Sequence, residues 1–207
     1  GEAIWPAQIH DCKAAIRWLR AHAKQYGIDP TRVAVWGSSA GGHLASMLGV
    51  TGGNQALEGT VGIHNTKSSR VQAVVNYYGP SALLRMNDYP SRINHNAPDS
   101  PESQLLGFPI QDNKKLTRQA SPLSHVCKDV ASFIHFHGTE DQLVPYNQSQ
   151  ILHQSMTEQS LPSILITLKM GGHTMPGHFT KKYVLPFLEY EFHEREKLPV
   201  TQVIEEN

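Results

Sequence analysis

The sequence predicts an α/β fold in which a mostly parallel sheet is flanked by helices, and three observations point to it. Short apolar runs typical of buried strands occur at residues 32–36, 71–78, 132–137 and 163–168. Segments with the helical spacing of apolar residues lie before or after most of these runs, which is typical of parallel strands joined by crossovers. The 207 residues are enough for one domain with a sizeable buried core.

The helical segments have recognisable boundaries. Residues 6–26 carry apolar side chains on one face, with Pro6 suited to the first turn and Gly27 a natural stop beyond the last. Three further helices are expected, at residues 40–50, 147–159 and 178–194.

The alternation breaks over residues 81–122, which are rich in Pro, Ser, Asn and Asp. An excursion of this length inside a compact domain is usually a functional lid or a binding loop. We therefore expect a single domain over residues 1–197, with 81–122 as a lid or substrate loop. Residues 198–207 are expected to form a loosely attached C-terminal tail.

Composition argues against several classes of function. Lys plus Arg and Asp plus Glu number 18 each, so no net field favours nucleic acid or an anionic membrane. No run approaches the ~20 apolar residues of a membrane span, and no signal-peptide pattern opens the chain. Cys12 and Cys127 lack disulfide-framework or zinc spacing, and His135 and His137 have no acidic partner at ligand spacing. We therefore expect no metal and no other cofactor.

A G-x-S-x-G motif joins a predicted strand to a predicted helix at Gly37–Gly41, the context in which a serine nucleophile sits on a tight turn. We expect Gly37 and Gly41 to avoid a clash across that turn and Ser39 to occupy a strained backbone conformation. The helix would aim its positive end at the site, and the backbone N–H of Ala40 would be one oxyanion-hole donor. Ser38 is expected to point away from the exposed tip.

Asp141 and His173 follow Ser39 in the order acid, then base, and each lies just beyond a predicted strand. The carboxyl ends of parallel strands meet at one edge of an open sheet, where such folds place their sites. Taken singly, Asp141 could be a turn carboxylate and His173 a surface imidazole. Together they predict a triad, with His173 as the base for Ser39 and Asp141 fixing the imidazole tautomer.

Four phrases carry a resemblance to a known family: PAQIHDCKAAIRWLRAHAKQYGIDPTRVAVWGSSAGGHLASMLG, SPESQLLGFPIQDN, FHGTEDQLVPYNQSQ and KMGGHT. Over residues 1–193 the chain resembles α/β-hydrolase fold esterases and lipases, especially bacterial acetyl- and feruloyl-esterase-like proteins. The resemblance implies an α/β-hydrolase-like sheet and small-molecule ester substrates with short or aromatic acyl groups, with plant polysaccharide as one candidate for the alcohol. It implies a soluble bacterial protein and leaves open whether it is cytoplasmic or secreted.

The resemblance has one departure, at the N-terminal end. The family's preceding strands and its His-Gly-Gly loop, which donates the second oxyanion-hole N–H, have no counterpart in the sequence. Because the chain also begins at Gly1 rather than Met, we expect it to be processed or excised from something longer. Strand 32–36 would then present an unpaired apolar edge, so we expect either a homo-oligomer through that edge or a truncated, weakly active product.

Three functions remain open at this stage. The leading one is a carboxylic ester hydrolase with an acyl-enzyme mechanism. A prolyl-oligopeptidase-like serine peptidase shares the fold and the triad order, but such enzymes tend to carry an aromatic residue where this chain has Ser38, and no propeller domain is present. The third is a non-catalytic fragment or interaction protein that keeps the triad residues without a complete oxyanion hole.

Overall fold

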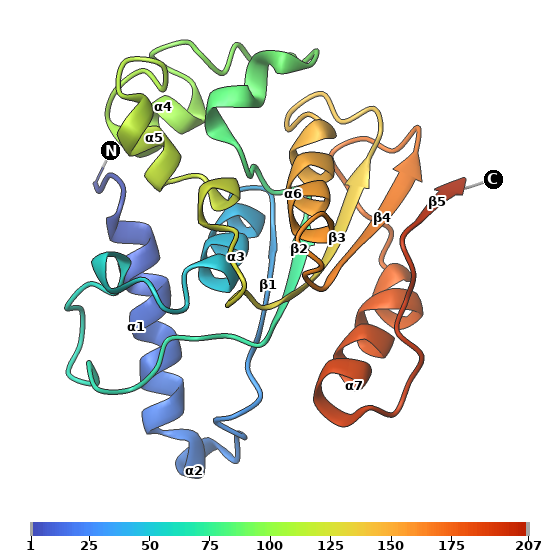
Figure 1. Ribbon diagram of the computed structural model, residues 1–207. Helices are drawn as coiled ribbons and strands as arrows, with labels where there is room; N and C mark the ends of the chain where they lie inside the picture. Colours follow the sequence, from blue (N-terminus) through green and yellow to red (C-terminus); the bar gives the residue numbers. More distant parts are fainter. Residues whose placement is uncertain (1, 206–207) are drawn as a thin grey trace.

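The computed structural model describes residues 2–205 and contains a five-stranded parallel sheet flanked by helices (Figure 1). The strands follow one another across the sheet in chain order. Their bounds are β1 Ala34–Ser38, β2 Ala73–Tyr77, β3 Ser132–Gly138, β4 Ser163–Lys169 and β5 Gln202–Glu205. The predicted α/β fold class, with a mostly parallel sheet flanked by helices, is confirmed.

Two hydrophobic cores cover the two faces of the sheet, because side chains alternate along each strand. Val74 of β2 and Phe133 of β3 belong to the first core, which is completed by helices α1, α3 and α6. Val75 and Ile134 belong to the second core, which is closed by α7 and the turn before it. Strands buried on both faces appear in the sequence as continuous apolar runs, which is why such runs located them. The helices span α1 Ala7–Ala21, α3 Ala40–Val50, α6 Asn147–Thr157 and α7 Leu185–His193.

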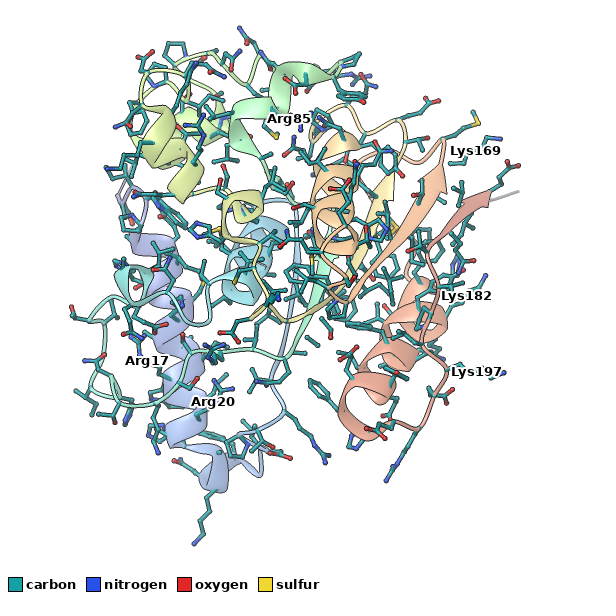
Figure 2. The ribbon with its side chains drawn as sticks, in the orientation of Figure 1. Arg17, Arg20, Arg85, Lys169, Lys182 and Lys197 are labelled. Carbon is teal, nitrogen blue, oxygen red and sulfur yellow. The ribbon has the colours of Figure 1, made fainter. Side chains whose placement is uncertain are left out.

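The predicted first helix is divided in two. It consists of α1 and the short α2, Ala23–Tyr26, which ends at Gly27 in the left-handed conformation. Two cations of α1, Lys13 and Arg17, are buried and share the carboxylate of Glu58, at 2.7 Å and 3.0 Å. Figure 2 shows Arg17 and Arg20 extending from α1, and the ion pairs attach α1 to the loop between α3 and β2.

The excursion over residues 81–122 contains short helical segments rather than an open loop. These are η2 Leu83–Asp88, α4 Pro101–Leu106 and α5 Lys114–Gln119. Figure 1 shows α4 and α5 at the end of the molecule toward which the strand arrows point. Open α/β sheets carry their sites at that end. The location of α4 and α5 is therefore compatible with a lid or substrate loop, and that role stays a prediction.

The C-terminal region differs from expectation at two points. The predicted helix 178–194 begins with a π-helical turn, η4 Thr180–Val184, before α7. The segment 198–207, expected to be a loose tail, contains β5, whose residues pair with β4 in parallel register. β5 has four residues, and Val203 is 65% exposed. A strand of this kind does not need the long apolar run that marks a buried strand, and therefore the sequence did not reveal it.

At the opposite side of the sheet lies β1, two residues later than the predicted strand 32–36. Within residues 2–205 it pairs only with β2, and Trp36 is 49% exposed. An oligomer through this edge stays a prediction. No helix among the described residues is long and apolar enough to cross a membrane.

Candidate active site

Ser39 occupies the turn between the end of β1 and the start of α3. Its backbone angles are φ 55° and ψ −123°, outside the regions that non-glycine residues ordinarily adopt. The turn is held because the N–H of Ser39 donates to the carbonyl of Tyr77 at 2.9 Å. Ala40 is the first residue of α3, so its N–H has no acceptor within the helix.

The tightness of this turn depends on Gly37. A Cβ at Gly37 would lie 2.1 Å from the backbone oxygen of Gly41. The expectation that Gly41 is equally constrained is wrong, because a Cβ there would meet no atom within 4 Å. The reason is directional: the Cβ of residue 37 would point across the turn into the backbone, whereas that of residue 41 would point away from it. A second close approach joins Gly42 and Gly79, where α3 packs against the end of β2.

The three predicted triad residues come together at the carboxyl edge of the sheet. His173 Nε2 lies 3.0 Å from Ser39 Oγ, and His173 Nδ1 lies 2.7 Å from Asp141 Oδ2. The side chain of Asp141 is fully buried, whereas that of His173 is 19% exposed. Both residues lie on loops that follow β3 and β4, as the strand-end pattern predicts. The loops approach closely because Gly138 carries no Cβ, which would lie 2.1 Å from the Gly171 oxygen.

The carboxylate of Asp141 is held in its charged form. Burial alone would raise its pKa, but hydrogen bonds from His137 and His173, and from the N–H groups of Leu143 and Val144, hold the pKa well below its usual range. An acid bonded in this way remains an acceptor throughout the neutral range. It can therefore hold the Nδ1–H tautomer of His173 and leave Nε2 free to accept a proton from Ser39.

His137, which sequence reasoning considered only as a metal ligand, supports Asp141 from the buried side. Its Nε2 lies 3.2 Å from Asp141 Oδ2 and 2.9 Å from the carbonyl of Val144, and its Nδ1 lies 2.8 Å from Ser149 Oγ. Two acceptors around Nε2 assign the proton to that nitrogen, so the Ser149 hydroxyl donates to Nδ1. Both ring nitrogens are thereby occupied. The feature of the sequence that could have indicated this contact is the position of His137, at the end of a predicted strand and four residues before Asp141.

His135 is on the same strand but belongs to the core. It is fully buried, its Nδ1 lies 3.1 Å from the amide of Asn76, and burial with the neighbouring His153 and His137 lowers its pKa to about 3. Among the described residues, no group of three or more His, Cys, Asp and Glu side chains is arranged to hold a metal ion.

A cavity of about 240 Å³ opens beside the turn that carries Ser39. It lies between the start of α3, the start of α1 and the excursion, and its lining is mostly apolar, with Leu44, Leu83 and Leu105 among its residues. Ala40 forms part of the same wall, so the cavity adjoins the N–H expected to receive the oxyanion. One carboxylate, Glu102, reaches the cavity and is fixed by His95 Nδ1 at 2.9 Å.

Tyr78 is a further residue of the site that the sequence did not reveal. It follows β2 directly, and its ring centroid lies 4.4 Å from that of His173. In the sequence it is only the last residue of the predicted strand 71–78, so nothing there indicates a place in the site.

Comparison with known proteins gives a consistent result. A family model described as BD-FAE matches residues 1–156. The chain is 34% identical over 184 residues to the probable carboxylic ester hydrolase LipM of Mycobacterium tuberculosis, covering 84% of this chain and 41% of LipM. It is 31% identical to the esterase LipQ of the same organism, covering 77% of this chain and 36% of LipQ. The chain thus spans about two fifths of the length of these curated relatives.

Solved structures of similar fold include one described as an esterase and one described as an ester hydrolase. A truncated form of a carbohydrate esterase from gut microbiota superposes with a TM-score of 0.80 at 34% identity, covering 91% of this chain and 68% of that one. A bifunctional GH43-CE protein of Bacteroides eggerthii gives a TM-score of 0.85 at 36% identity, covering 93% of this chain and 28% of that one. An acetyl ester-xyloside bifunctional hydrolase from Caldicellulosiruptor lactoaceticus gives 0.68 at 25% identity, covering 90% and 64%.

Proposed function

Since the chain belongs to the BD-FAE family of α/β-hydrolase esterases, we propose that it forms the catalytic core of a serine carboxylic ester hydrolase. The observation that carries the proposal is the continuous hydrogen-bonded path from Ser39 Oγ through His173 to Asp141, with distances of 3.0 Å and 2.7 Å. This is the arrangement a serine hydroxyl needs to become a nucleophile at neutral pH.

Acylation follows from the geometry. As Ser39 Oγ attacks the ester carbonyl carbon, His173 Nε2 takes the hydroxyl proton, and the carbonyl oxygen becomes an oxyanion. The N–H of Ala40 donates to that oxyanion; losing one such donor costs about 10² to 10³ in rate in known enzymes. Collapse of the tetrahedral intermediate breaks the bond to the alcohol oxygen, which takes the proton from His173 and leaves.

Deacylation repeats these steps with water as the nucleophile. His173 accepts a proton from a water molecule that attacks the acyl carbon, and returns it to Ser39 Oγ as the acid departs. Asp141 keeps the imidazole in the Nδ1–H tautomer in both halves and stabilises the imidazolium while it carries the proton. His137 supports Asp141 by donating to the same carboxylate oxygen, Oδ2.

The proposed substrates are esters with short or aromatic acyl groups, attached to a carbohydrate alcohol. The cavity of about 240 Å³ beside Ala40 is mostly apolar, which suits the acyl part. The carbohydrate part is supported by two similar structures, one described as a carbohydrate esterase and one as an acetyl ester-xyloside hydrolase. Plant polysaccharide is one candidate for that alcohol.

A fluorophosphonate probe tests the mechanism. We expect stoichiometric labelling of Ser39 in the wild type and none in Ser39→Ala. The matched control is Ser68→Ala, at an exposed serine on the loop between α3 and β2, which should be labelled at the wild-type rate. A folded wild type that is not labelled at Ser39 would contradict the proposal and favour a non-catalytic protein.

Substrate choice is tested separately with paired chromogenic substrates. Short and aromatic acyl esters of p-nitrophenol should be hydrolysed, and aminoacyl p-nitroanilides should not. Preferential cleavage of the anilides would favour the prolyl-oligopeptidase-like alternative. Acetylated and feruloylated xylo-oligosaccharides compared with simple alkyl esters then test the carbohydrate part.

A further inference from the structure

Tyr78 stands directly after β2 in a backbone conformation that a bulky residue rarely adopts. Its φ is 43°, in the left-handed region that favours glycine and, less strongly, asparagine. The backbone is fixed there because its N–H donates to the carbonyl of Phe136 on β3 at 2.8 Å. Nothing in the sheet requires an aromatic side chain at this point. Strain of this kind at the edge of a site points to a role for the side chain.

The ring of Tyr78 lies against the base. Its centroid is 4.4 Å from that of His173, with the two planes at 51°, and 6.3 Å from that of His137. The negative charge of Asp141 is close enough to influence the Tyr78 hydroxyl. The ring, which directly follows β2, therefore lies close to the imidazole of His173 and to the buried Asp141.

The hydroxyl of Tyr78 lies near the side chain of Ser38, the last residue of β1 and the neighbour of Ser39. Burial, together with the charge of Asp141, raises the pKa of Tyr78, so the phenol remains neutral and keeps its proton. The ring thus extends from the end of β2 toward the end of β1.

His173 needs such a neighbour. Its two hydrogen bonds, to Ser39 and to Asp141, use the two ring nitrogens and leave the faces of the imidazole to be held by neighbouring side chains. The Tyr78 ring, whose centroid lies 4.4 Å from that of His173, restricts rotation of the imidazole about its side-chain bonds. The π electrons of that ring favour the imidazolium that forms during acyl transfer.

We propose that Tyr78 is a positioning residue that holds the imidazole of His173 in line between Asp141 and Ser39 and stabilises its charged form. This rests on the proposed function, because it assigns Tyr78 an effect only through a catalytic His173. The aromatic ring is the essential part, and the hydroxyl is secondary.

Three substitutions separate these features. Tyr78→Phe keeps the ring and loses only the hydroxyl, so kcat should fall by no more than about threefold. Tyr78→Leu and Tyr78→Asn remove the ring, so kcat and the rate of fluorophosphonate labelling should both fall, on the order of tenfold to a hundredfold. Asparagine tolerates the left-handed backbone better than leucine does, so Tyr78→Asn carries the test if Tyr78→Leu fails to fold.

The readouts distinguish positioning from mere structure. The proposal expects kcat to fall with KM within about threefold of wild type, and the Phe variant to restore kcat. It is overturned if a folded Leu or Asn variant is labelled at the wild-type rate, or if KM rises with kcat unchanged, since Tyr78 would then only line the substrate site. Labelling of the wild type at Ser39 with these negative results leaves the proposed function standing. Absence of labelling in the wild type overturns both.

Discussion

Two glycines of the turn that carries Ser39 have the same place in the sequence motif but differ in the space around them in the structure. Gly37→Ala and Gly41→Ala each add one methyl group. The methyl at position 37 would lie 2.1 Å from the Gly41 oxygen and 2.3 Å from its carbonyl carbon, more than 1 Å inside ordinary contact. The methyl at position 41 would meet nothing within 4 Å.

The two substitutions are therefore expected to differ in their effect on the free energy of unfolding. Overpacking commonly costs 1–3 kcal/mol, and here the clash is with backbone of the turn itself, so we expect Gly37→Ala to lower the free energy of unfolding by about 3 kcal/mol or more. Gly41 lies in the first turn of α3 without a positive φ, so Gly41→Ala should leave that free energy unchanged or raise it by up to about 1 kcal/mol.

Urea unfolding of the two variants and the wild type measures the difference in the free energy of unfolding. The rate of fluorophosphonate labelling of the folded Gly37→Ala protein shows whether the altered turn still presents Ser39. A Gly37→Ala protein of wild-type stability would refute the steric account of the turn. Equal destabilisation by both substitutions would refute the distinction between them.

Three further predictions concern charged groups. Asp141→Asn should lower kcat by about 10⁴ with little change in fold, as in other triads, because the amide no longer selects the Nδ1–H tautomer of His173; p-nitrophenyl acetate hydrolysis measures it. The depressed pKa of Asp141 means that its contribution to stability is present above the ordinary carboxyl pKa of about 3.9 and is lost as pH falls below it. The urea midpoint of the wild type should therefore fall more steeply between pH 5 and pH 3 than that of Asp141→Asn, and parallel curves would contradict this. Glu58→Gln should cost about 2–4 kcal/mol of unfolding free energy because it leaves the buried Lys13 and Arg17 without their counter-charge, and a neutral effect in thermal or urea unfolding would count against a role for the pair.

Much of the fold was predictable because its strands are buried on both faces. A parallel strand covered by helices on each side, such as β3, is mostly apolar, with Phe133, Ile134 and Phe136 buried, and that pattern is visible without any knowledge of contacts. β5 escaped because it is an edge strand of four residues, with Val203 exposed and only Ile204 packed on the core. Its place is decided by pairing with β4, which no local pattern reveals.

The candidate site also contains residues that the sequence could predict and residues that it could not. Parallel strands place their carboxyl ends at one edge, so the order and strand-end positions of Ser39, Asp141 and His173 were enough to predict that they meet. The supporting residues were not predictable, because their function depends on direction. His137 and Tyr78 each end an apolar strand in the sequence, and only the three-dimensional arrangement shows that His137 contacts Asp141 and that Tyr78 lies beside His173.

The most direct test of the account is mass spectrometry of the intact protein and its peptides after reaction with a fluorophosphonate. The account predicts one adduct per chain, on the peptide that contains Ser39, with labelling abolished in Ser39→Ala and slowed at least a hundredfold in His173→Ala. A folded wild type that carries no adduct, or an adduct on another residue, would contradict it.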